Sequence, residues 1–223
     1  MYNNFVDFCI NGLNVTPNYL QAVNGIKITG EYCKNCSDFS GTNYDLAAFY
    51  KKVKFLDSIC PICGYCKQNT QMVDMCIKEG GEATTLAHML MLYYVYCMDK
   101  YHSITAIHCT DKCARTGFNS LQTLIKNSQC FEKHVSDENT LTVVVGSGKI
   151  SFVDTKLSAI RRNNNAMVYI ENFYSFPVNP SEKLISQRDA VLDAAKNTLL
   201  AHQAAFEKGV VGSCGLLLIL GNY

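Results

Sequence analysis

Apolar positions recur at helical spacing in three long segments of the chain. Residues 83–98 are apolar nearly all round, which predicts a buried helix. Residues 116–127 and 181–207 place apolar side chains along one face, which predicts helices with one buried side. Ser181 is a suitable N-cap for the last helix, and Gly209 is a suitable stop.

Shorter runs of β-branched, aliphatic and aromatic residues predict strands between and after these helices. Gly146-Ser147-Gly148 joins two of the runs and predicts a tight hairpin, so we expect a small antiparallel sheet over residues 141–173. The last run predicts a strand that is either buried or donated to a neighbouring copy. The runs are residues 104–109, 141–145, 149–153, 166–173 and 215–220. Together the pattern predicts an α/β fold with a central mixed sheet and flanking helices.

Composition and charge narrow the partners that the protein is expected to bind. The chain has 223 residues, of which 48% are hydrophobic and 17% charged, so it can bury a substantial core. Lys and Arg number 20 against 19 Asp and Glu. Because positive and negative charges balance, the protein has no net positive potential to attract a nucleic-acid backbone or an anionic membrane. We therefore expect no membrane partner, and no nucleic acid except an RNA 5′-end.

The first residues and the cysteine count bear on the compartment. Residues 1–14 contain no basic segment followed by an apolar stretch, so we expect no secretion signal and a cytoplasmic or nuclear protein. The chain has 12 cysteines. In a reducing compartment this number points to metal ligands or a catalytic thiol, whereas an assembly that later leaves the cell could oxidise them to disulfides.

Residues 1–76 read as a cysteine-rich module ahead of an α/β domain over residues 77–223, although the whole chain could form one compact domain. Two CxxC knuckles in this module can supply four thiolates in a tetrahedron, which is the geometry of structural Zn²⁺. Cys66 could replace one ligand, and disulfides or plain core thiols are the alternative. Residues 45–56, between the knuckles, have apolar side chains at helical spacing. The predicted zinc ligands are Cys33, Cys36, Cys60 and Cys63.

Residues 107–117, with the sequence IHCTDKCARTG, have the form HCx5R followed by Ser or Thr and Gly. A cysteine between a strand and a helix is exposed to oriented backbone N–H groups, which stabilise a thiolate and can hold a phosphate. Arg115 could return across such a loop to bind phosphate oxygens with two hydrogen bonds. Thr116 could donate a hydrogen bond to the thiolate of Cys109.

This motif resembles that of the cysteine-dependent phosphatases, which include protein tyrosine and dual-specificity phosphatases and RNA 5′-triphosphatases. The resemblance implies a phosphatase-like strand, loop and helix at residues 104–127. It makes Cys109 the nucleophile that forms a phosphocysteine, Arg115 the phosphate clamp, and Thr116 and His108 supporting residues. Asp74 is the chosen general acid, with Glu79 and Glu82 as alternatives. The implied phosphate loop is Thr110, Asp111, Lys112, Cys113, Ala114 and Arg115.

Two functions from different classes follow. The first is a phosphatase acting on a phosphoprotein or an RNA 5′-end. The second is a self-assembling viral structural protein, such as a coat or occlusion-body matrix, with copies of itself as partner and an inherited, inactive phosphatase-like scaffold. Near-zero net charge favours self-association. Lys112 distinguishes the two functions. Most of these phosphatases have Gly at this position of the loop, whereas an inactive scaffold does not require it. The alternative is that the motif has only a structural role, in which Cys109 ends a buried strand and Arg115 is an ion-pair partner.

Overall fold

The computed structural model describes the second half of the chain almost throughout and shorter pieces of the first half. The described residues are 7–15, 27–28, 44–45, 53–55, 73–78, 83–98, 102–128, 130–131, 134–172, 182–211 and 215–221. No helix within these ranges is long and apolar enough to cross a membrane.

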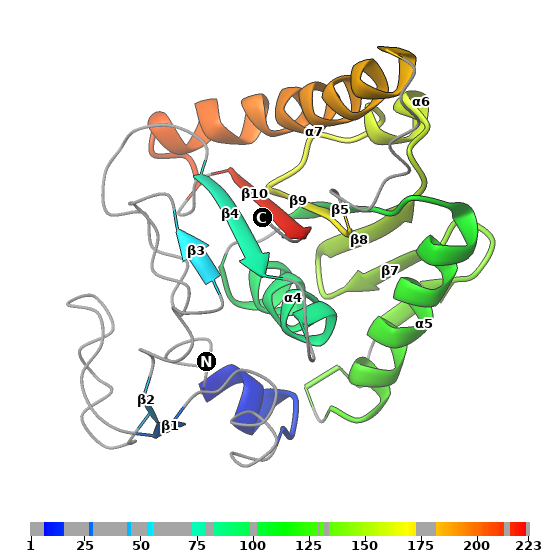
Figure 1. Ribbon diagram of the computed structural model, residues 1–223. Coiled ribbons are helices and arrows are strands. Elements are labelled where there is room, and N and C mark those ends of the chain that lie inside the picture. The colour runs from blue at the N-terminus through cyan, green and yellow to red at the C-terminus, as the bar shows by residue number, and fades with distance from the viewer. Residues whose placement is uncertain are drawn as a thin grey trace.

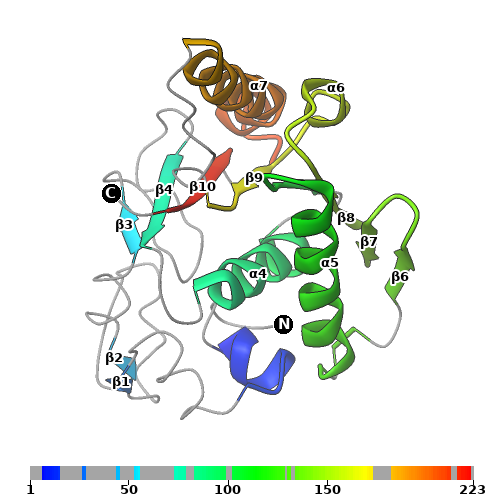
Figure 2. The same cartoon turned by 45° about the vertical axis from the view of Figure 1, so that its right-hand side comes forward.

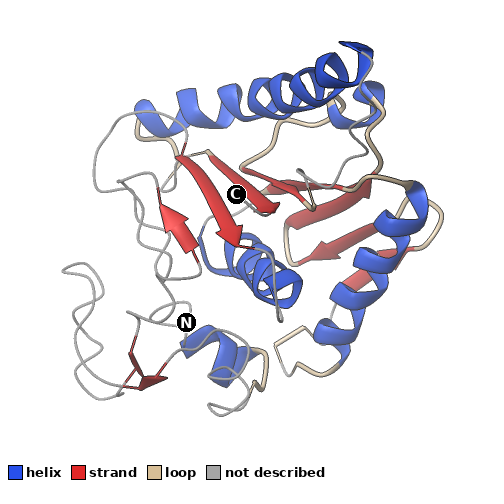
Figure 3. Cartoon of the chain, in the orientation of Figure 1, coloured by secondary structure: helices blue, strands red, loops and turns tan. Residues whose placement is uncertain are grey.

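An eight-stranded mixed sheet forms the centre of the described structure (Figures 1 and 3). Five neighbouring strands, β4, β10, β9, β5 and β8, run parallel, and antiparallel strands extend the sheet at both edges. A separate antiparallel pair joins β1 (Lys27–Ile28) to β2 (Tyr44–Asp45). In sheet order the eight strands are β3 (Val53–Phe55), β4 (Val73–Lys78), β10 (Leu216–Gly221), β9 (Met167–Ile170), β5 (Ser103–Ile107), β8 (Gly148–Val153), β7 (Thr142–Val145) and β6 (His134–Asp137).

Helices cover both faces of this sheet (Figures 1 and 2). On one face lie α4, its π-helical continuation η3, α5 and the short π-helix η1, and on the other lie α6 and α7. The arrangement is therefore a three-layer α/β fold, which confirms the predicted α/β class with a mixed sheet and flanking helices. The bounds are η1 Phe8–Gly12, α4 Ala83–Tyr93, η3 Tyr94–Met98, α5 Asp111–Lys126, α6 Leu157–Ile160 and α7 Glu182–Glu207.

The central strands are apolar on both sides because each side is covered by a helical layer. In β10, Leu216 and Leu218 pack into the core beneath α4, whereas Leu217 and Ile219 pack into the core beneath α7. Successive side chains of a strand point to opposite faces, so one run of leucines serves both cores. β10 lies between β4 and β9 of its own chain, which confirms that this run is a buried strand.

One local prediction is wrong, and one local pattern does not correspond to the element that forms. Residues 166–173 do not extend the antiparallel hairpin of β7 and β8, because β9 pairs in parallel with β5 and β10. Residues 53–55 form β3, which pairs with β4, although residues 45–56 have helical spacing. In both cases long-range pairing in the sheet overrides a local pattern. β4 also spans the predicted domain boundary at residues 76 and 77, so the residues before it contribute to this sheet.

Close packing between α5 and the sheet requires a glycine in the middle of the helix. The His108 ring is fully buried and stacks on Phe152, with ring centroids 5.6 Å apart. A Cβ atom on Gly117 would lie 2.6 Å from Cε1 of His108 and 3.2 Å from a ring carbon of Phe152. Neither ring is the end of a flexible chain, so the helix could not approach the sheet this closely with a larger residue.

We expect Gly117→Ala to destabilise the protein, although Ala normally stabilises a helix interior by about 0.5–1 kcal/mol relative to Gly. Overpacking against two buried rings costs about 1–3 kcal/mol and outweighs that gain. Urea unfolding measures the difference. Asn119→Ala, at an exposed position of the same helix, is the control and should be neutral or slightly stabilising. A Gly117→Ala protein as stable as this control would contradict the packing argument.

Candidate functional site

The segment expected to form a phosphate loop is helical. α5 begins at Asp111, two residues after Cys109, and not near residue 116. Thr110 is extended, with φ −144° and ψ 161°, and its Oγ1 accepts a hydrogen bond of 3.2 Å from the backbone N–H of Cys113. Thr110 is therefore an N-cap. The backbone N–H of Cys113 is therefore occupied by the cap and is not free for a bound anion.

The side chains expected to surround a phosphate point elsewhere. Nη1 of Arg115, in the second turn of α5, lies 3.5 Å from the carbonyl oxygen of Glu138, to which it donates. Oγ1 of Thr116 donates to the carbonyl oxygen of Lys112 at 3.0 Å, within its own helix. Asp111 places a negative charge in the first turn, and Ala114 is buried in the core. These residues cap and pack a helix and do not form the expected phosphate loop.

Cys109 lacks the environment of a thiolate nucleophile. Burial and the neighbouring sulfur of Cys113 raise the pKa of the Cys109 thiol, although a hydrogen bond with Thr110 opposes this shift. Cysteine nucleophiles require the opposite shift. His108, the residue expected to orient Cys109, instead contacts Glu171 on a neighbouring strand.

Asp74, the chosen general acid, lies far from Cys109. It occupies β4 at the same level of the sheet as Thr105 of β5, with β10 and β9 between them. Cys109 follows the carboxyl end of β5, so the two backbones are about 13 Å apart along the strands and about 14 Å apart across them. Asp74 therefore cannot protonate a leaving group held by Cys109. The alternatives Glu79 and Glu82 lie outside the described residues.

The predicted zinc ligands also lie outside the described residues, as does Cys66. They are Cys33, Cys36, Cys60 and Cys63. Among the residues that the structure describes, no three His, Cys, Asp or Glu side chains gather closely enough to hold a metal ion. The zinc site in the cysteine-rich segment stays a prediction.

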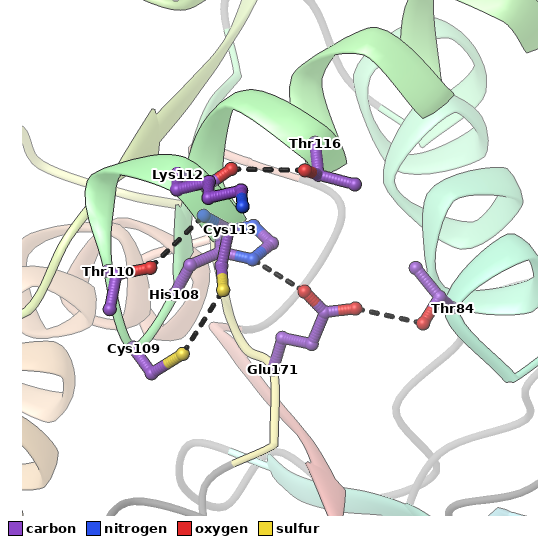
Figure 4. A network of polar contacts seen from close by, with 8 residues as sticks. All are labelled: Thr84, His108, Cys109, Thr110, Lys112, Cys113, Thr116 and Glu171. Atoms are coloured by element: carbon purple, nitrogen blue, oxygen red, sulfur yellow. Dashed lines mark hydrogen bonds and ion pairs between the residues drawn. The ribbon is translucent and has the colours of Figure 1, made fainter.

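Three side chains that the sequence analysis did not connect meet at the carboxyl ends of the parallel strands (Figure 4). Oγ1 of Thr84, in the first turn of α4, donates a hydrogen bond of 2.8 Å to Oε1 of Glu171, which follows β9. The other carboxylate oxygen, Oε2, lies 2.5 Å from Nδ1 of His108, which follows β5. Glu171 is thus held from two sides and joins α4 to two strands.

The charge of Glu171 is stabilised although the residue is largely buried. Burial alone would raise the pKa of this carboxyl, but His108 and the hydroxyl of Thr84 outweigh it, and the pKa is lowered. Tyr169, two residues earlier on the same face of β9, is fully buried beneath the carboxylate, and burial raises the pKa of its phenol well above the usual value. The site therefore keeps one negative charge above an apolar layer.

His88 of α4 lies in that layer. Its ring packs edge-to-face on Phe152 and Tyr169, at centroid distances of 5.9 and 6.3 Å. Neither ring nitrogen has a hydrogen-bond partner among the described residues. Burial lowers the pKa of His88 to about 4, with the positive field of His108 adding to the shift and Glu171 opposing it. His88 is consequently neutral at physiological pH.

Comparison with known proteins gives no family. No family model matches the chain, and no curated protein matches it. Among solved structures the chain is similar to the large terminase of bacteriophage HK97, with 11% sequence identity and a TM-score of 0.47. The match covers 62% of this chain and 26% of the terminase chain, so it spans about a quarter of that protein.

The resemblance to cysteine-dependent phosphatases is therefore wrong. Neither the family models nor the curated proteins identify a phosphatase, because none of them matches the chain. The HCx5R sequence is present, but its loop residues form the first turns of α5 and its arginine faces a backbone carbonyl. A short motif specifies side chains, whereas the loop also needs a backbone that leaves its N–H groups free. The N-cap at Thr110 is the sequence signal for the helix that forms instead.

Two sequence signals could have located the Thr84–Glu171 contact. Glu171 directly follows the apolar run Met167–Ile170, and an acidic residue at the carboxyl end of a buried strand is a typical position for a functional group. Thr84 comes shortly after Gly80-Gly81, between a strand and a helix. The missing information was sheet order, which brings the ends of β4, β9 and β5 to one edge.

Acidification from pH 7 to pH 5 should lower the free energy of unfolding by about 2 kcal/mol through His88. The folded protein holds this histidine neutral down to pH of about 4, whereas in the unfolded chain it takes up a proton below about pH 6.5. His88→Leu removes the proton uptake and should abolish this part of the pH dependence, measured by urea unfolding at both pH values.

His134→Gln, at the edge strand β6, is the matched control and should keep the pH dependence. The depressed pKa of Glu171 acts only below its ordinary range of about 4.3, so it contributes little between pH 7 and 5. An unchanged slope in His88→Leu would show that His88 is not the buried base.

Proposed function

We propose that the protein is a nucleoside-triphosphate-binding domain of the P-loop class, which binds Mg²⁺ and phosphate beside Thr84 and Glu171. The observation that carries the proposal is the hydrogen bond of 2.8 Å between these two side chains. In P-loop proteins a Ser or Thr at the start of the first helix and an acidic residue at the end of another strand together hold the magnesium ion of the nucleotide.

The order of strands supports this proposal. Open parallel sheets bind ligands beyond the carboxyl ends of their strands. β4 leads into α4, and β9 leads into Glu171, while β10 lies between these two strands. The hydroxyl at the start of α4 and the carboxylate after β9 therefore face each other across the end of β10. A helix N-terminus at this edge adds a partial positive charge that favours phosphate.

The donor atoms fit magnesium. Mg²⁺ takes oxygen ligands at about 2.0–2.1 Å in an octahedron, so neighbouring ligands lie about 2.9 Å apart. The oxygens of Thr84 and Glu171 are 2.8 Å apart. Protein magnesium sites commonly contain one or two carboxylates and take their remaining ligands from phosphates and water. His108 holds the other carboxylate oxygen, so it is a positioning residue for Glu171.

Four positions depart from an active P-loop enzyme and limit the proposal to binding. Ile77 and Glu82 stand where the P-loop sequence has its two glycines. Ala83 directly precedes Thr84, where the P-loop sequence has the lysine that reaches the β- and γ-phosphates. Asn172 directly follows Glu171 and is an amide, which cannot accept a proton from an attacking water. We infer that nucleotide binds more weakly than in proteins with the lysine, and the proposal does not include hydrolysis.

Fluorescent ATP binding tests the site directly. With Mg²⁺ present we expect saturable binding, and both Thr84→Val and Glu171→Gln should weaken it at least tenfold, which is about 1.4 kcal/mol. Thr84→Ser keeps the hydroxyl and should retain most of the affinity. With EDTA in place of Mg²⁺, all four proteins should bind equally weakly, because the substitutions act through the ion.

Matched controls make the same chemical changes elsewhere. Thr123→Val, on the exposed side of α5, and Glu207→Gln, at the end of α7, should bind ATP like the unchanged protein. Circular dichroism verifies that every variant is folded. Absence of saturable ATP or GTP binding by the unchanged protein, or equal loss in the control variants, would refute the proposal.

Restoring the missing lysine is a gain-of-function test. A hydrogen bond between a charged donor and phosphate contributes about 1.5–3 kcal/mol, so Ala83→Lys should tighten ATP binding by tenfold or more. Asn119→Lys adds the same charge on the exposed surface of α5 and controls for general attraction of anions. Equal tightening by both variants would mean that ATP is not bound at the start of α4.

The structural zinc and the assembly of the chain with copies of itself, both predicted from the sequence, are independent of this proposal and stay predictions.

A further inference from the structure

Two cysteine sulfurs lie side by side where β5 leads into α5. Sγ of Cys109 is 3.3 Å from Sγ of Cys113 (Figure 4). Both residues are partly exposed, so small reagents in solution can reach them. Cys9 is a contrast within the same chain, because it is fully buried and its sulfur lies against the sulfur of Met89 at 3.6 Å.

Local structure holds this pair together. Thr110 caps α5 and accepts a hydrogen bond from the N–H of Cys113, which fixes the first turn of the helix. Cys109 directly precedes this cap, and its sulfur lies against that of Cys113 in the first turn of the helix. His108 is locked between Phe152 and Gly117 and anchors the other end of this turn. The sulfurs are therefore near each other in a rigid turn.

We propose that Cys109 and Cys113 form a reversible disulfide when the protein meets a two-electron oxidant such as hydrogen peroxide. A disulfide bond is about 2.05 Å long, so the sulfurs need to approach by about 1.3 Å, which side-chain rotation can supply. The proposal does not depend on nucleotide binding, because neither sulfur contacts Thr84 or Glu171 in the described structure.

The chemistry balances in two steps. A thiolate of the pair attacks one oxygen of the peroxide, the O–O bond breaks, and a sulfenic acid forms as hydroxide leaves and takes a proton to give water. The second sulfur then attacks the sulfenic sulfur, the S–S bond forms, and a second water leaves. Two thiols and one hydrogen peroxide give one disulfide and two waters. Either sulfur can react first, since the other is already 3.3 Å away.

The raised pKa of the Cys109 thiol makes this reaction slow near neutral pH and faster as the pH rises, because the thiolate is the reacting form. The raised pKa also distinguishes this cysteine pair from a catalytic nucleophile, which must be ionised in the resting protein. A thiol of this kind responds to a sustained oxidant and not to every turnover of a substrate.

The sequence provides a specific readout. Trypsin cleaves after Lys100, Lys112 and Arg115, so it separates the two cysteines into the peptides 101–112 and 113–115, each with one cysteine. The protein is treated with hydrogen peroxide, its remaining thiols are blocked with N-ethylmaleimide at acidic pH, and the digest is analysed by mass spectrometry. We expect the two peptides joined by a disulfide, and separated again by dithiothreitol.

Variants establish which sulfurs take part. Cys109→Ser and Cys113→Ser should each abolish the linked peptide, whereas Cys97→Ser, at a cysteine elsewhere in the fold, should leave it unchanged. Cys9 should still be reduced when the linked peptide has formed. Circular dichroism shows whether each variant is folded.

Three results would overturn the proposal. Both cysteines could remain fully reactive towards N-ethylmaleimide at a peroxide dose that oxidises dithiothreitol. Cys109 could proceed to a sulfinic acid without forming the bond, or either cysteine could join a different cysteine in preference to its neighbour. Because the readout is covalent linkage, none of these results depends on whether the protein binds ATP.

Discussion

The carboxylate of Glu171 is the interaction around which the described fold is organised. Its two oxygens contact a hydroxyl from α4 and a ring nitrogen from the end of β5, so three elements far apart in the sequence meet at one charge. A buried carboxylate is costly unless both oxygens are satisfied. The cost explains why His108 is wedged tightly between Phe152 and Gly117, because a looser ring could not hold this position.

The same contact explains the composition of the layer below it. Tyr169, His88 and Phe152 pack beneath the carboxylate and are buried, so water cannot reach the charge from the core side. His88 has no hydrogen-bond partner among the described residues and stays neutral, which avoids a second charge close to Glu171. The carboxylate of Glu171 thus lies at the edge of the sheet, and the neutral His88 ring lies in the core beneath it.

Much of the fold could be predicted from the sequence, because its signals are local. Helix α7, the hairpin of β7 and β8, and the apolar strand β10 follow from spacing, turn residues and composition. The α/β class follows from their order. Sheet order could not be predicted, since β9 and β4 each pair with β10, which is distant in sequence from β4 and separated from β9 by α7.

The candidate site was missed for the same reason. Thr84 and Glu171 form no recognisable motif in the sequence, because only the sheet brings them together. The HCx5R run, in contrast, is contiguous and can be read directly from the sequence. That run was misjudged because its residues are compatible with both a loop and a capped helix. Thr110 decides the outcome, as its side chain satisfies an N–H group that a phosphate loop would leave free. A contiguous motif therefore carries less weight than the backbone it requires.

The position of β10 affects how the protein can be made. This strand follows all the other described strands in the sequence, yet it lies inside the sheet between β4 and β9. On the ribosome, β4 and β9 emerge with a gap between them that only residues 216–221 can fill. Until those residues leave the exit tunnel, two apolar strands have unpaired edges that other chains could occupy. The parallel centre of the sheet therefore closes only when residues 216–221 have been synthesised and can pair with both strands.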